Sequence, residues 1–200
     1  MVVKAILAGT AWFLVPTLAM AHHAMDGRLP DGPVAGLLSG LGHPVIGFDH
    51  LAFVVGIGVL AAVARLGSGP VLGFVGGTLA GCLVHVAGAG LPLAEVAIGL
   101  SLLVLAGLVA LGRSPWPGRL AVLALAGLFH GYAYGESIVG AEPAALGAYL
   151  VGFSLIQAAI ALGTARLVEM VTGGAAARTR FLAQGAAVLL AVAGTAVLIA

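Results

Sequence analysis

Six apolar runs, each about as long as a bilayer is thick, set the limits on how this chain can fold. They lie at residues 47–66, 70–88, 92–112, 118–139, 144–171 and 181–200. A helical run of ~20 apolar residues crosses the hydrocarbon core of a membrane. Only 8% of the residues are charged and 62% are hydrophobic, whereas a soluble domain carries ~25% charged residues. We therefore predict an all-α integral membrane protein with six transmembrane helices.

The first 21 residues have the layout of a secretory signal peptide. Lys4 supplies the positive charge, residues 5–18 are apolar, and Ala19-Met20-Ala21 fits the small-x-small cleavage rule. A retained first helix is the alternative. Cleavage would leave His22 and His23 at the new N-terminus, either as a metal-capturing end or as part of a polar linker.

The segment before the first span is too short to cross a bilayer. Residues 32–41 are apolar but rich in glycine, and Pro44 follows them. We expect a short re-entrant or interfacial segment here. The predicted organisation is a signal peptide at 1–21, an outer polar segment with this short helix at 22–46, and a six-helix transmembrane domain at 47–200.

The loop charges predict the orientation. Alternate loops carry arginines, and the turns between them, at 89–91 and 140–143, carry no Lys or Arg. Basic loops stay on the inner side of a membrane. The mature N-terminus is therefore expected outside, in agreement with a signal peptide. The arginines are Arg65, Arg113, Arg119, Arg178 and Arg180.

Ionisable side chains gather on the predicted outer half of the spans. Charged groups inside a membrane are costly and usually mark a functional site. Imidazole and carboxylate together suit divalent transition metals. One outward-open cluster drawn from four helices is the simplest explanation. Its members are Asp49, His50, His85, Glu95, His130 and Glu136.

Two motifs carry most of these groups. The first is His43-Pro44-Val45-Ile46-Gly47-Phe48-Asp49-His50, and the second is Phe129-His130-Gly131-Tyr132-Ala133-Tyr134-Gly135-Glu136. His130 and Tyr134 are four residues apart and share a helix face. Small residues at every fourth position let helices approach closely. They occur at Gly73, Gly77 and Gly81, and again at Gly127, Gly131 and Gly135.

The two motifs resemble those of the HupE/UreJ family of membrane metal permeases. That family has His-Pro-x-x-Gly-x-Asp-His early in the mature chain and Phe-His-Gly-x-Ala-His-Gly-x-Glu in a later helix. The first motif is matched in full. In the second, Tyr134 replaces a histidine, and Glu136 follows Gly135 directly instead of after one residue.

The resemblance implies a permease of a bacterial inner membrane rather than an enzyme. It would import Ni²⁺, or Co²⁺, for hydrogenase, urease or cobalamin pathways, with no tightly bound cofactor. Zn²⁺ also suits these donors. The expected ligands are His43, Asp49, His50 and His130. Secondary or entrance roles are expected for His22, His23, His85, Glu95, Tyr134 and Glu136.

Other classes are excluded or remain as alternatives. The sequence has no basic patch for nucleic acid and no phosphate-binding loop for ATP. The alternatives are a haem-binding membrane cytochrome, an intramembrane metalloenzyme and a metal-binding or sensor protein that does not transport. A homo-oligomer is compatible with the glycine stripes.

Overall fold

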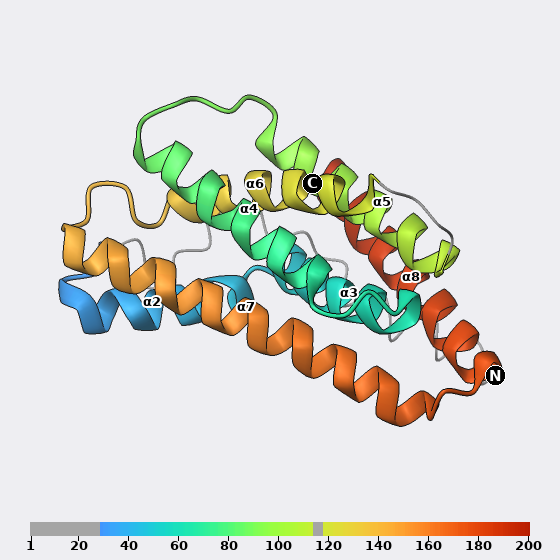
Figure 1. The fold of residues 1–200 in the computed structure, drawn as a ribbon. Coiled ribbons are helices and arrows are strands. Elements are labelled where there is room, and N and C mark those ends of the chain that lie inside the picture. The colour runs from blue at the N-terminus through green and yellow to red at the C-terminus, as the bar shows by residue number, and fades with distance from the viewer. Residues whose placement is uncertain (1–28, 114–117) are drawn as a thin grey trace, which may run out of the picture.

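The computed structural model describes residues 29–113 and 118–200, and these are entirely helical or turn-like. The predicted signal peptide, with His22 and His23, lies outside the described residues. The all-α class is confirmed for the described part of the chain, which forms seven helices (Figure 1). They are α2 (Gly32–Ile46), α3 (Phe48–Ala64), α4 (Gly69–Val86), α5 (Ala94–Leu111), α6 (Arg119–Gly135), α7 (Pro143–Thr172) and α8 (Ala176–Ile199).

Four of these helices are long and apolar enough to cross a membrane on their own: α4, α5, α7 and α8. The pair α2 and α3 meets the same standard only when taken together, as one span bent by 80°. Helix α6 has 17 residues, because the chain leaves the helix at Glu136 instead of continuing to residue 139. The described residues therefore hold four candidate spans, or five with the bent pair, and the predicted count of six is not confirmed.

The segment before α3 is longer than the apolar run at residues 32–41. It is a helix of 15 residues that reaches Ile46 and has Pro44 inside it. The break comes at Gly47, whose backbone is extended with φ −71° and ψ 109°. The predicted boundary between residues 46 and 47 thus coincides with the bend. A bent pair of this kind is either a broken span or a re-entrant loop.

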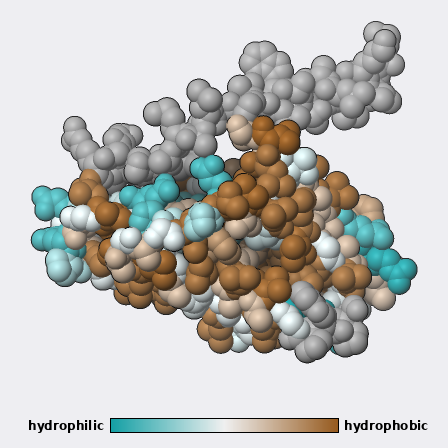
Figure 2. Space-filling model, turned by 90° about the horizontal axis from the view of Figure 1, so that it is seen from above, coloured by the Kyte–Doolittle hydropathy of each residue, from teal (hydrophilic) through white to brown (hydrophobic). Residues whose placement is uncertain are grey.

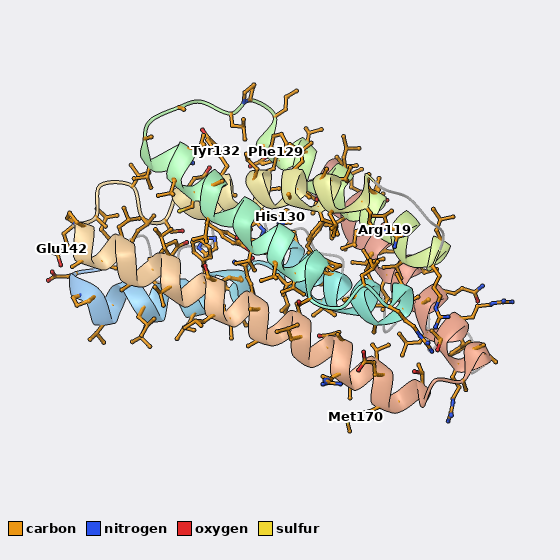
Figure 3. All side chains as sticks on the ribbon, viewed as in Figure 1. Arg119, Phe129, His130, Tyr132, Glu142 and Met170 are labelled. Atoms are coloured by element: carbon orange, nitrogen blue, oxygen red, sulfur yellow. The ribbon has the colours of Figure 1, made fainter. Side chains whose placement is uncertain are left out.

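Helix α7 matches its predicted run, whereas α8 begins earlier than predicted. Helix α8 begins at Ala176, not at residue 181, so Arg178 and Arg180 belong to its first turns and not to a loop. In Figure 1 the α7–α8 connection lies at the right end of the bundle and the α6–α7 connection at the left end. The arginines of α8 are therefore at the end opposite Glu142, which Figure 3 labels at the left.

Glycines bring the helix backbones into direct contact in several pairs, including α3 with α7, where Gly58 meets the Ala161 carbonyl. Between α4 and α6, a methyl group at Gly81 would overlap the Leu128 carbonyl, and one at Gly131 would overlap that of Thr78. Gly40 of α2 meets the Tyr149 carbonyl of α7 in the same way. Gly99 of α5 faces Gly194 of α8. The close packing expected from the stripes is confirmed, except at Gly73, whose nearest neighbour leaves room for a side chain.

Helix α3 occupies the middle of the bundle, where it packs against α7, α5 and α8. Phe53, Ile57 and Leu60 are fully buried. The outer faces of the other helices are apolar, with exposed Leu72, Leu155 and similar side chains. Figure 2 shows this surface as mostly hydrophobic, with hydrophilic residues gathered toward its ends. An apolar girdle of this kind needs lipid as its solvent.

The glycine contacts predict a sharp difference between two residues of α4. Gly81→Ala should lower the free energy of unfolding by about 1–3 kcal/mol, because the methyl group must push α4 away from α6. Gly76→Ala is the matched control, since nothing lies within 4 Å of the position of its Cβ. Thermal unfolding in detergent measures both. Equal effects of the two changes would contradict the predicted role of the close contact.

Candidate metal site

Histidines from the two motifs meet between α3 and α6. The Nδ1 atoms of His50 and His130 lie 2.9 Å apart. His130 is completely buried and His50 is 6% exposed. Figure 3 shows His130 inside the bundle, between the helices. Residues 80 positions apart in the sequence thus share one buried contact.

The hydrogen bonds of Ser101 assign the protons of this pair. Its hydroxyl donates to the Ile98 carbonyl at 2.7 Å, so its oxygen accepts from His130 Nε2 at 3.1 Å. A neutral imidazole with its proton on Nε2 has a lone pair on Nδ1. His130 therefore accepts at Nδ1, and His50 donates.

His43 reaches the same place from the end of α2. Its ring stacks on His50 with centroids 5.8 Å apart, and its Nδ1 is 2.9 Å from Ser137 Oγ. It is 5% exposed. The bend at Gly47 makes this possible, because a side chain at residue 47 would overlap the ring of His50. The glycine of the first motif is therefore explained by the folding of the motif on itself.

Tyr134 lies between these histidines. Its ring centroid is 4.9 Å from that of His43 and 4.6 Å from that of His50. The side chain is fully buried, and its hydroxyl has no hydrogen-bond partner among the described residues. A buried hydroxyl without a hydrogen-bond partner lowers the stability of the fold. Because it has no partner among the described residues, this oxygen is available to a ligand.

Aromatic rings close the other sides of the cluster. Phe53 and Phe74 pack on His130, with centroids 4.5 and 5.6 Å away. Tyr149 donates its hydroxyl to the Tyr134 carbonyl at 2.8 Å. Low-polarity walls strengthen the interaction between a cation and its ligands.

Asp49 stands beside the cluster. Its Oδ2 is 3.6 Å from His50 Nδ1, and its side chain is 22% exposed. That separation is too long for a hydrogen bond. The carboxyl group lies near the histidines and is more exposed than any of their rings.

Three predicted residues are not part of the cluster. His85 Nδ1 is 2.8 Å from the Tyr132 carbonyl, and its ring packs at a tilt on the Tyr132 ring with centroids 4.2 Å apart, so it joins α4 to α6. Glu95 and Glu136 are exposed. In the described residues no three His, Cys, Asp or Glu side chains converge closely enough to hold a metal ion. The facing nitrogens of His50 and His130 are therefore a pair, with Tyr134, His43 and Asp49 beside them.

The sequence motifs did not reveal the hydroxyl groups that position the histidines. Ser101 is the one hydroxyl-bearing residue in the apolar helix α5. A single hydroxyl in an otherwise apolar helix can be recognised from the sequence. Ser137 follows the second motif directly, but the turn that aims it at His43 is not visible in the sequence.

The fold and the site together define a helical membrane protein with a buried histidine cluster. A family profile described as HupE / UreJ protein matches residues 10–197. The chain belongs to this family, which is associated with nickel and cobalt transport and is a transporter family rather than an enzyme family.

A curated relative supports the assignment. Protein HupE of Rhizobium leguminosarum bv. viciae is 31% identical over 181 residues, covering 82% of this chain and 88% of the relative. No solved structure matches the chain.

The Ser101 contact predicts an effect on metal binding. Ser101→Ala should weaken binding about 10–100-fold, because a partner that orients a ligating imidazole contributes that much to affinity. Ser154→Ala is the matched control, since its hydroxyl donates only to Leu150 of its own helix. Titration of the purified protein with Ni²⁺ measures both. Unchanged affinity in Ser101→Ala, or an equal loss in both variants, would contradict the assigned role.

Proposed function

We propose that this protein imports a divalent transition metal, Ni²⁺ or Co²⁺, across a bacterial inner membrane. The observation that carries the proposal is the 2.9 Å separation of the His50 and His130 nitrogens. Nitrogen ligands bind such ions at about 2.0–2.1 Å, so two of them at a right angle lie about 2.9 Å apart. The pair is spaced as ligands of one ion would be.

Binding would exchange the hydrogen bond between the histidines for two metal bonds. His130 already presents its Nδ1 lone pair. His50 must move its proton from Nδ1 to Nε2, which a neutral imidazole does without a change in charge. His43, Asp49 and the Tyr134 oxygen complete the proposed ligand set, with His85, Glu95 and Glu136 outside it.

The proposed topology has six spans, with α6 as a short span and α2 as a re-entrant helix that carries His43 to the site. A cleaved signal peptide and inner-side arginines put the cluster toward the outside. The membrane potential then drives uptake, since it is worth about 2.3 kcal/mol per charge per 100 mV, and twice that for a divalent ion. Supply of nickel to metalloenzyme maturation is the proposed role in the cell.

The geometry is unfavourable for a haem. Axial histidines must leave room for a macrocycle between their nitrogens. The imidazoles of His50 and His130 are in hydrogen-bond contact, and Phe53 and Phe74 pack on the second ring. A metal sensor without transport needs the same site, so only an uptake experiment distinguishes it from a permease.

Metal accumulation in cells tests the proposal directly. Cells that express the wild type should accumulate nickel or cobalt from a low-micromolar supply, and His50→Ala should abolish the gain because one of the two facing nitrogens is lost. His85→Ala is the control, since its ring lies outside the cluster. Elemental analysis with zinc and copper in the same panel identifies the metal. If the purified protein binds the metal but the cells do not accumulate it, the protein is a sensor and not a permease.

The unpartnered hydroxyl of Tyr134 gives a second test. Tyr134→Phe should weaken Ni²⁺ binding about tenfold and leave thermal stability equal or higher, because it removes an unsatisfied buried group. Tyr149→Phe is the contrasting variant. It breaks a buried hydrogen bond and should lower stability with little change in affinity. Unchanged affinity in Tyr134→Phe would exclude the hydroxyl as a ligand.

A further inference from the structure

A second buried oxygen without a partner lies deeper in the bundle. Gln157 of α7 is fully buried, and among the described residues its Oε1 accepts no hydrogen bond. Buried amide oxygens are nearly always paired, so each exception calls for an explanation by a missing water or ion. The rest of the side chain shows what holds this oxygen in place.

The amide nitrogen of Gln157 fixes the orientation of the group. It donates to the Phe153 carbonyl at 3.0 Å and faces Thr78 Oγ1 at 3.4 Å. A flipped amide would place its oxygen against the Phe153 carbonyl, where both atoms are acceptors. The nitrogen therefore stays where it is, and Oε1 is the atom left free.

Thr78 belongs to the same polar group. It is fully buried in α4, and its hydroxyl donates to the Val75 carbonyl at 2.9 Å. Thr78 Oγ1 accepts from Gln157 Nε2 at 3.4 Å, so one of its two lone pairs remains available beside Gln157. Two side-chain oxygens from α4 and α7 thus lie in an interior that is otherwise lined by apolar residues.

This oxygen pair follows directly after the histidine cluster along the bundle. Phe153 packs on Tyr134 at 5.4 Å, and Gln157 is one turn, about 6 Å, further from the Pro143 end of α7. On α4, the Thr78 carbonyl contacts Gly131, the neighbour of His130. In the proposed orientation, the pair lies on the inner side of the site.

The surrounding pattern favours an apolar residue at this position. Along α7, Tyr149, Phe153, Gln157 and Ala161 recur every four residues and are all buried. Leucine has nearly the same volume as glutamine and would leave no unsatisfied oxygen. The glutamine therefore lowers the stability of the fold and gains no partner within the described residues.

We propose that Gln157 Oε1 and Thr78 Oγ1 form a second cation station, which receives the metal after the histidine cluster. This inference rests on the proposed function. Neutral oxygens bind Ni²⁺ or Co²⁺ more weakly than imidazoles do. A transport path needs such weaker sites, because an ion that binds too tightly does not leave. The station would carry the ion from the histidine cluster toward the inner side of the bundle.

Gln157→Leu tests the station in the full-length protein reconstituted in liposomes. The initial rate of radioactive Ni²⁺ uptake should fall about tenfold or more, while equilibrium binding by the purified protein stays within about threefold, because the histidine cluster is intact. The melting temperature should stay equal or rise, since the free oxygen is gone. Thr78→Val should lower uptake in the same direction. Ser154→Ala is the control on α7, the helix that carries Gln157, and it should leave uptake unchanged.

The outcomes separate this inference from the proposed function. Uptake by Gln157→Leu within about twofold of the wild type overturns the station and leaves the permease in place. A lower melting temperature together with slower uptake shows that Gln157 is structural, which also overturns it. Absence of uptake by the wild type overturns the proposed function and the station together.

Discussion

Direct backbone contact between helices is the constraint on which the rest of the structure depends. Inside a bilayer, helices gain little from burying apolar side chains, so they associate by close packing at small residues. Gly81 and Gly131 bring α4 and α6 together, and Gly40 brings α2 onto α7. These contacts set the depth and rotation of His43 and His130. The chemistry of the site is thus a consequence of helix packing.

The buried polar side chains fall into two kinds, those with hydrogen-bond partners and those without. The Ser101–His130–His50 chain satisfies each of its donors in turn, whereas the side-chain oxygens of Tyr134 and Gln157 have no partner among the described residues. A fully paired network stabilises a fold, and an unpaired oxygen opposes it. The contrast separates the groups that position the site from the groups that lack a partner, which are Tyr134 of α6 and Gln157 of α7.

Much of the fold could be predicted because hydropathy is a local property. The approximate positions of α3, α4, α5 and α7 follow from the apolar runs. The bent pair α2–α3 could not be predicted in this way. Its geometry depends on the extended backbone at Gly47 and on the room that glycine leaves for His50. Helix α6 ends early for a similar reason, since residues after Gly135 turn so that Ser137 contacts His43.

The class and the family of this protein follow from its sequence alone, because composition and motif spacing do not depend on distances between helices. The motifs also identify His50 and His130 as candidate ligands. Which of the candidates meet depends on the tertiary structure. His85 carries the same side chain but faces Tyr132, while Ser101 and Gln157 gain their roles from helices remote in the sequence. Such contacts depend on how each helix is rotated about its axis, and that rotation is fixed by the packing of the whole bundle.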